Sequence, residues 1–444
     1  MPSRTALVAI AVALTLLAGA IVMLRARPAS PWRARQVVLI TIDTLRASRL
    51  GLYGYRTQPT SPNLDAWARS AVVFDRATAP TPWTVPSLGA LHTGRYPAEV
   101  GTYTNGDGIH PDFTTLAELF RAQGFATASF NTHALLIGAR GGFRQGFDTV
   151  YPSQITPIVE GEHKMPFAAT EPPLMEWLAA HAQQPFFVWV HNMDPHLPRT
   201  TGNPYLAATG WHRYDAEVRW MDEAVGRILA KLRDLGLGED LLVVFTADHG
   251  EAFGDEHGLV GHQDVMYDEV LRVPLLMAFP GMGEPRRIAE PVDLIDLYAT
   301  IAELGGLPVP ADTRSESLVP LFAGAQHRAP YAYHARYFFE DGRHWLAVRD
   351  REWKLLARTP DLDRAPRHRN APRWVLEEPK TYFELYRIAD DPGEQHDLYE
   401  QHPEQVARLS EVLEKWGDSV AQGPTRPELD DATQEALRAL GYEP

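Results

Sequence analysis

The sequence contains no cysteine among its 444 residues. This absence excludes disulfides, thiolate metal sites, a cysteine nucleophile and lipid attachment through cysteine. An exported bacterial protein can do without disulfides, so the absence does not decide the compartment. It limits the chemistry instead, because any covalent catalysis has to use a different nucleophile.

Positive charge is also scarce, with 42 lysines and arginines against 57 aspartates and glutamates and a net charge of -15 at pH 7. Such a surface would repel a polyanion, so we expect no nucleic-acid partner. Hydrophobic residues make up 45% of the chain and aromatic residues 10%, which supplies a packed core rather than a disordered chain. The length predicts one large domain with a smaller domain beside it.

One apolar run, Thr5–Leu24, has 20 residues and no charge, which is the length that a helix needs to cross a bilayer. Two interpretations compete, an uncleaved membrane anchor and a signal peptide cleaved near Ala18–Ala20, and a buried core helix is a third. We favour an anchor, with residues 1–36 as anchor and linker. The rest of the chain would then lie outside the cytoplasm, in a bacterial periplasm or at the cell surface. Cleavage would instead make the protein secreted.

Four apolar runs of strand length end abruptly in polar residues. They are Val37–Ile42, Phe125–Phe130, Phe186–Val190 and Leu241–Phe245. Continuous apolar runs predict strands buried on both faces, and hence a mainly parallel sheet. Helical patterns lie between them, at Leu64–Ser70, Leu116–Gln123, Leu174–Gln183 and Tyr214–Leu235. This alternation predicts a three-layer, doubly wound α/β domain over residues 37–330.

The pattern of apolar segments changes after about residue 330. Short apolar segments at His344–Arg349 and Trp353–Ala357 are separated by Pro-rich and basic stretches, and a helical pattern follows at Pro403–Trp416. This predicts a smaller α+β subdomain with antiparallel strands over residues 331–444.

The polar residues that follow the four strands are the first indication of a functional site. In open α/β sheets, ligands bind outside the carboxyl ends of the strands. Asp43 follows the first strand, and Asp248 and His249 follow another, so two carboxylates and an imidazole can reach one cation. Thr84 and Pro86 fit the start of a helix, with Thr84 as its N-cap, where an anionic ester would be attracted. Its hydroxyl is therefore a candidate nucleophile.

Several short motifs occur in a fixed order along the chain. They are Asp43–Arg46 with Leu50–Tyr55, Thr84–Ser87 with Leu91–Arg95, Asp194–His196, Thr246–Glu251, Gly258–His262 before Arg272–Pro274, and Leu385–Tyr386 with Asp391–Glu394. In this order they resemble the sulfatase family of the alkaline phosphatase superfamily, over about residues 37–398. The resemblance implies the fold predicted above and a hydrolase acting on ester bonds.

The departures from the family pattern concern the nucleophile and the anion-binding groups. Sulfatases carry a Cys or Ser that is oxidised to formylglycine where this chain has Thr84, so no formylglycine is expected. Leu88 replaces the family's Arg, Thr44 replaces the second Asp of the opening pair, and the family's Lys-x-His is not matched at residues 131–133. A threonine nucleophile resembles the phosphoethanolamine and phosphoglycerol transferases of the same superfamily.

We therefore predict a sulfatase-like, metal-dependent hydrolase of sulfate or phosphate esters with Thr84 as metal-bound nucleophile. The predicted metal ligands are Asp43, Thr84, Asp248 and His249, and the cation is Ca²⁺, Mg²⁺, Mn²⁺ or Zn²⁺. The predicted substrate-binding residues are His196, His262 and Asn131, and both histidines are also candidates to protonate the leaving group.

The substrate would be a small-molecule, glycan or lipid-linked ester, and its identity is left open. Two other functions remain open as well. One is a transferase that moves a phosphoryl-alcohol group at the membrane surface, and the other is a non-catalytic binding protein with a degenerate site.

Overall fold

The computed structural model of the chain describes residues 33–137, 142–153, 165–196, 202–208, 210, 212–238, 240–262, 265–325, 331–337, 344–358 and 382–420. The apolar run Thr5–Leu24, on which the predicted anchor rests, lies outside these residues. Among the residues that are described, no helix combines the length and the apolar character needed to span a membrane.

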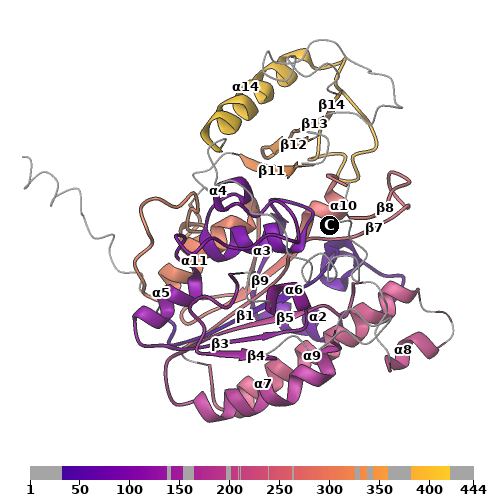
Figure 1. The fold of residues 1–444 in the computed structure, drawn as a ribbon. Helices are drawn as coiled ribbons and strands as arrows, with labels where there is room; N and C mark the ends of the chain where they lie inside the picture. The colour runs from indigo at the N-terminus through magenta and orange to yellow at the C-terminus, as the bar shows by residue number, and fades with distance from the viewer. Residues whose placement is uncertain are drawn as a thin grey trace, which may run out of the picture.

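A large sheet of eight strands forms the centre of the fold (Figure 1). Its strands in spatial order are β10 (Arg286–Asp293), β2 (Val72–Thr78), β9 (Arg272–Ala278), β6 (Leu241–Ala247), β1 (Gln36–Ile42), β5 (Phe186–Asn192), β3 (Ala126–Asn131) and β4 (Thr149–Tyr151). All neighbouring strands are parallel except that β9 is antiparallel to both β2 and β6. The predicted mainly parallel α/β sheet is therefore confirmed.

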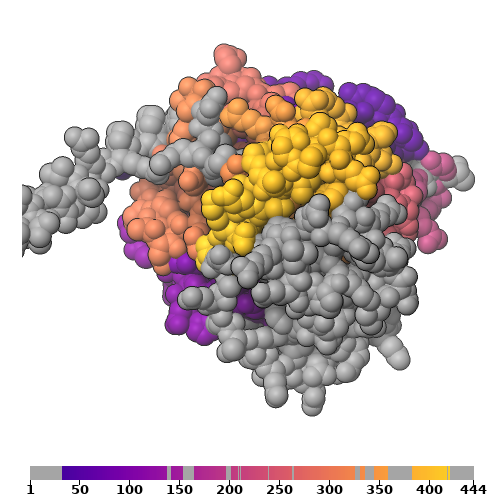
Figure 2. Space-filling view, turned by 90° about the horizontal axis from the view of Figure 1, so that it is seen from above, coloured from indigo at the N-terminus to yellow at the C-terminus, as the bar shows by residue number. Residues whose placement is uncertain are grey.

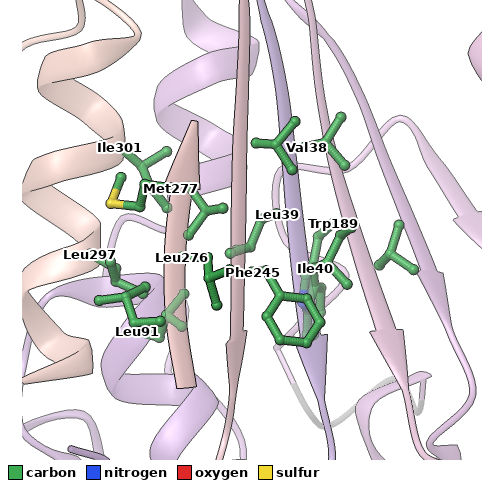
Figure 3. Packing of buried hydrophobic residues seen from close by; sticks show 14 of the residues in the cluster. Val38, Leu39, Ile40, Leu91, Trp189, Phe245, Leu276, Met277, Leu297 and Ile301 are labelled. Atoms are coloured by element: carbon green, nitrogen blue, oxygen red, sulfur yellow. The ribbon is translucent and has the colours of Figure 1, made fainter. Parts of the chain in front are cut away.

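Helices cover both faces of this sheet, and its central strands are therefore buried along their whole length. Figure 1 shows α7 (Phe167–His181) and α9 (Arg213–Asp234) on one side, and α3 (Thr84–Thr93), α5 (Leu116–Ala122) and α11 (Leu297–Leu304) on the other. Close to the sheet, Leu91, Leu297 and Ile301 from helices lie in one cluster with Leu276 and Met277 of β9 (Figure 3). The fold therefore has the three layers that the sequence predicts.

Shorter elements fill the connections between these layers. They are η1 (Ala47–Arg49), η2 (Gly51–Tyr53), α2 (Pro62–Trp67), η3 (Ala68–Ser70), α4 (Pro97–Val100), α6 (Ala134–Ile137), α8 (Pro204–Ala207), β7 (Ala252–Phe253), β8 (Val260–Gly261), α10 (Asp268–Leu271), η4 (Leu294–Asp296) and α12 (Val319–Phe322).

A second, antiparallel sheet follows in the order β11 (Ala332–Tyr337), β12 (His344–Arg349), β13 (Lys354–Arg358) and β14 (Tyr382–Tyr386). Helix α14 (Pro403–Val420) packs on it through a separate apolar cluster that includes Leu355, Leu409 and Leu413. Seen from above, helix α14, in yellow, lies across the middle of that face of the molecule (Figure 2). This arrangement confirms the predicted C-terminal antiparallel sheet, while the predicted boundary at residue 330 lies outside the described residues.

The two sheets are joined by a buried ionic cluster. Asp268 of α10 accepts hydrogen bonds from Arg349 at 2.8 Å and from Lys354 at 3.1 Å. Lys354 also pairs with Glu394 at 2.6 Å and is completely buried. Burial works against ionisation of Asp268, but the two cations outweigh it and hold the pKa of that carboxyl well below its usual range. The cluster therefore links the large domain to the C-terminal sheet through buried charges that compensate one another.

Candidate active site

The three central strands β5, β1 and β6 end level with one another at their carboxyl ends. In the register of the sheet, Ile42 lies opposite Asn192 on one side and Ala247 on the other. The next backbone groups continue the ladder, since Asp43 N–H donates to the Asn192 carbonyl at 2.9 Å and Asp248 N–H donates to the Ile42 carbonyl at 3.3 Å. Asp43 and Asp248 are therefore placed side by side by strand pairing.

Both carboxylates are completely buried. One oxygen of Asp248 accepts hydrogen bonds from His249 N–H at 2.7 Å and from Thr44 N–H at 3.1 Å. Thr44 adopts a φ of 56°, an uncommon conformation for a β-branched residue, and this turns its N–H toward Asp248. The other oxygen of Asp248 has no hydrogen-bond partner among the described residues. Burial, and next the charge of Asp43, raise the pKa of Asp248 well above its usual range.

His191 of β5 completes a group of three with these two aspartates. One ligand atom each from Asp43, His191 and Asp248 lies within 4.8 Å of the others. The Nε2 atom of His191 is 3.4 Å from Asp43 Oδ2. The imidazole is completely buried, and this burial lowers its pKa to about 4, which favours the neutral ring that metal ions bind.

The chemistry of this group fits a divalent cation. Two neighbouring carboxylates in the protein interior repel each other and lose their hydration, which is costly unless a positive charge compensates them. Asp248 Oδ2 and His191 Nε2 are both buried atoms that form no hydrogen bond within the described part of the chain. Carboxylate oxygens and a neutral imidazole are common ligands of divalent metals. The two aspartates therefore fit a divalent cation, with the neutral ring of His191 beside them.

Thr84 is the first residue of α3 and not its N-cap, which is Trp83, so that part of the prediction is wrong. The Trp83 backbone is extended, with φ of -126° and ψ of 141°, and the helix begins at Thr84. Helix α3 is buried along its whole length, and the N–H of Val85 donates to Asn105 Oδ1 at 2.9 Å. The Thr84 hydroxyl is therefore a buried group at the positive end of a helix.

His249 is the hydrogen-bond partner of Thr84. The distance from Thr84 Oγ1 to His249 Nε2 is 3.3 Å, and His249 Nδ1 lies 2.9 Å from the Gly250 carbonyl. Because that carbonyl can only accept, Nδ1 carries the proton and Nε2 presents a lone pair to Thr84 and to Asp248 Oδ2, which is 3.6 Å away. At Gly250, an added Cβ would come within 2.6 Å of the Glu269 carbonyl, so only glycine fits behind this histidine.

Two further histidines face His249. The His249 and His262 rings lie 4.5 Å apart, and the His196 and His262 rings lie 5.5 Å apart. His262 Nδ1 is 3.1 Å from Glu251 Oε1. Burial disfavours the protonated form of His262, but the Glu251 carboxylate outweighs it and raises the pKa of His262 above its usual value. His262 is therefore suited to carry a proton.

Asn131 lies one strand further out, at the end of β3 and opposite His191 in the register. Its Oδ1 accepts the N–H of His133 at 2.8 Å, and its buried Nδ2 donates to no described residue. His133 and His92 are also completely buried, and burial lowers the pKa of each to about 3. Both neutral rings lie near His191, and the His133 ring is 6.2 Å from the His191 ring.

Asp194 and His257 contact backbone groups of neighbouring segments. Asp194 Oδ1 accepts the N–H of Phe167 at the start of α7, at 3.1 Å. His257 Nε2 lies 2.9 Å from the Glu394 carbonyl, and the His257 ring stacks on Tyr267 at 3.6 Å.

A second group, Glu256, His257 and Glu269, also has the spacing of metal ligands. Arg46 already supplies its positive charge, because this buried guanidinium pairs with Glu256, with Asp255 at 2.9 Å and with Glu269 at 3.5 Å. The group therefore holds the loop between β7 and β8 to the segment that follows β1.

The fold brings together the seven site residues predicted from sequence, although the role of each stays a prediction. They are Asp43, Thr84, Asn131, His196, Asp248, His249 and His262. His191 was not among the predicted ligands, and Glu251 had no predicted role. His191 is the penultimate residue of the buried strand β5, and its contact with Asp43, which follows the neighbouring strand β1, is visible only once the strand order is known.

A model of the sulfatase family matches residues 35–307, and a model described as N-sulphoglucosamine sulphohydrolase, C-terminal, matches residues 255–365. Human arylsulfatase A is 28% identical over 429 residues, covering 82% of this chain and 83% of that protein. An ulvan-active sulfatase from Formosa agariphila is 27% identical over 332 residues, which span 64% of this chain and 64% of that enzyme.

Solved structures show the same fold at lower identity. Phosphonate monoester hydrolase of Agrobacterium radiobacter superposes with a TM-score of 0.70 at 20% identity, covering 87% of this chain and 96% of that one. Ps i-CgsB, solved in complex with k-i-k-neocarrahexaose, superposes with a TM-score of 0.71 at 21% identity, covering 92% and 98%.

Proposed function

The chain belongs to the sulfatase family, whose members hydrolyse sulfuric esters, and we propose that it is a metal-dependent esterase of this family in which Thr84 is the nucleophile. The observation that carries the proposal is the position of the Thr84 hydroxyl. It is buried at the start of α3, 3.3 Å from His249 Nε2, and this nitrogen is 3.6 Å from Asp248 Oδ2. The substrate is a sulfate ester or a chemically related phosphate ester, and sulfated glycans are one class that relatives of this chain act on.

The cation would be held by Asp43, Asp248 and His249 together with the Thr84 oxygen. When bound, such an ion lowers the pKa of a hydroxyl and balances negative charge on the transferred group. The partial positive charge at the N-terminus of α3 favours the same anionic group. No formylglycine is expected, because oxidation of a threonine side chain would yield a ketone rather than an aldehyde.

The remaining residues handle the substrate and the proton. The Thr84 hydroxyl releases its proton to solvent, its oxygen forms a bond to sulfur or phosphorus, and the bond from that atom to the leaving oxygen breaks. His262, whose Nδ1 is held by Glu251 at 3.1 Å, donates a proton to the departing oxygen, which leaves as an alcohol. His196 contacts the oxygens of the transferred group. Water then hydrolyses the ester formed on Thr84.

Intact-mass analysis after incubation with an aryl sulfate and an aryl phosphate tests the proposal. A mass increase of one sulfuryl or phosphoryl group, mapped to Thr84 by peptide sequencing, is the expected result. Release of the aryl alcohol with no dependence on Thr84 would contradict the assignment. Metal retention without turnover of any ester would point to a binding protein.

A transferase is a second candidate, favoured by the threonine at the nucleophile position. In that reaction an acceptor alcohol, rather than water, resolves the ester on Thr84. Turnover that appears only when a lipid or glycan alcohol is added would identify it. We further propose that the apolar run Thr5–Leu24 directs the catalytic domain out of the cytoplasm, which suits a substrate at a membrane or outside the cell.

A further inference from the structure

His191 belongs to the group of three at the candidate cation site, but it is not among the ligands of the proposed function. Its Nε2 is completely buried, 3.4 Å from Asp43 Oδ2, and forms no hydrogen bond with any described residue. The orientation of this ring depends on its other nitrogen, because the partner of Nδ1 determines which nitrogen carries the proton.

The partner of His191 Nδ1 is the hydroxyl of Thr41 on β1, 2.8 Å away. Two other groups contact this hydroxyl, the Trp189 indole N–H at 2.9 Å, which must donate, and the Val190 carbonyl at 3.4 Å, which must accept. A hydroxyl has one proton and two lone pairs. If His191 Nδ1–H donates to Thr41, both lone pairs and the proton are used, and all three partners are satisfied.

The opposite tautomer satisfies fewer groups. If Thr41 donated its only proton to Nδ1, it could no longer donate to the Val190 carbonyl. Of its two lone pairs, only the one that accepts from Trp189 would then be used. His191 Nε2 would then carry a hydrogen, but its position relative to Asp43 does not make a hydrogen bond. The hydrogen-bond count therefore favours a proton on Nδ1 and a lone pair on Nε2. That lone pair faces a carboxylate oxygen, which is repulsive unless a cation lies between them.

We propose that His191 Nε2 is a metal ligand beside Asp43, Asp248 and His249, that Thr41 and Trp189 are positioning residues for it, and that the site therefore takes Zn²⁺ in preference to Ca²⁺. The inference builds on the cation site of the proposed function and adds a ligand and a metal class to it. Two neutral imidazoles in a compact group suit Zn²⁺, whereas Ca²⁺ takes six to eight oxygen ligands.

Metal binding by the full-length protein, stripped of metal, tests this inference without any substrate. Calorimetric titration should show tighter binding of Zn²⁺ than of Ca²⁺, and His191→Gln should weaken Zn²⁺ binding by roughly 100-fold or more. X-ray absorption of the zinc-loaded protein should count two imidazole ligands in the wild type and one in His191→Gln. His133→Gln is the matched control, because it removes another buried imidazole beside the site that is not in the group of three.

The positioning role has its own matched pair. Thr41→Val should weaken Zn²⁺ binding by roughly 10–100-fold, since it removes the acceptor that holds His191 Nδ1. Thr246→Val should leave Zn²⁺ affinity unchanged, because Thr246 lies opposite Thr41 on β6 and its hydroxyl donates only to backbone carbonyls. If His191→Gln does not fold, the wild-type ligand count and the Thr41→Val titration decide.

One imidazole in the wild type, stronger Ca²⁺ binding than Zn²⁺ binding, or wild-type Zn²⁺ affinity in His191→Gln would overturn the inference. These results differ from a failure of the proposed function. A protein that binds Zn²⁺ with two imidazoles but turns over no ester would refute the esterase and leave the ligand assignment standing.

Discussion

Replacing Thr84 by valine removes a single hydroxyl from a side chain that is completely buried at the start of α3. We expect the variant to lose turnover by on the order of 10⁴-fold or more while it stays folded, because the hydroxyl is the proposed nucleophile and loss of a nucleophile in known covalent enzymes has effects of this size. Thr84→Ser keeps the oxygen and removes only a methyl group, so it should retain measurable turnover.

The structure sets the size of the effect that a merely structural hydroxyl would have. Its described hydrogen bond to His249 Nε2 is 3.3 Å long, and such a bond contributes about 0.5–1.5 kcal/mol to stability. If losing this hydrogen bond raised the activation barrier by the full amount of about 1.5 kcal/mol, the rate would fall by only about tenfold. A loss of 10⁴-fold corresponds to about 5.4 kcal/mol, so the two roles are well separated.

The assay combines initial rates on an aryl sulfate and an aryl phosphate with urea unfolding of the same preparations. The expected pattern is a collapsed rate with a free energy of unfolding within about 1–2 kcal/mol of wild type. A Thr84→Val enzyme that works within about tenfold of wild type would refute the reasoning. So would a peptide mass spectrum that shows Thr84 to be chemically modified in the wild type.

Three further predictions concern metal content, stability and topology. Elemental analysis of the purified protein should find at least one divalent cation, and equal metal in Asp248→Ala would contradict its role as a ligand. Asp268→Asn removes the buried carboxylate that pairs with both Arg349 and Lys354, so the free energy of unfolding at pH 7 should fall by about 3–5 kcal/mol. Because the folded pKa of Asp268 is depressed, its contribution is present above the unfolded value of 3.8 and is lost as the pH falls below it. The difference between wild type and Asp268→Asn should therefore shrink below about pH 4, and a constant difference would argue against ionic stabilisation. A reporter fused after residue 40 should be active outside the cytoplasm, and activity confined to the cytoplasm would overturn the proposed topology.

The elements of the large sheet could be predicted because their information is local. The apolar run Val37–Ile42 became β1, and the helical pattern at Tyr214–Leu235 became α9, shifted by one residue at each end. The spacing of apolar residues along the chain predicts both a continuously buried strand and a helix with one apolar face. The carboxylates that follow such strands can be recognised for the same reason.

Other parts of the fold depended on distant pairing. Strand β9 is antiparallel to both of its neighbours in an otherwise parallel sheet, and nothing in Arg272–Ala278 itself gives its direction. The start of α3 at Thr84 rather than at the following residue depends on the extended Trp83 before it. The direction of β9 follows from its pairing with β2 and β6, which lie far away in the sequence.

The sequence by itself determined the family, the sheet and most of the residues at its carboxyl edge, because motifs and apolar runs are local patterns. Only the tertiary structure decided which of those residues meet. It placed β5 beside β1. His191 therefore lies next to Asp43, and its Nδ1 forms a hydrogen bond with the Thr41 hydroxyl. Strand order and register join residues that are about 150 positions apart, as the separation of Thr41 and His191 shows. The physical reason is that a ligand set is defined by distances between side-chain atoms, and these distances exist only after the strands have paired.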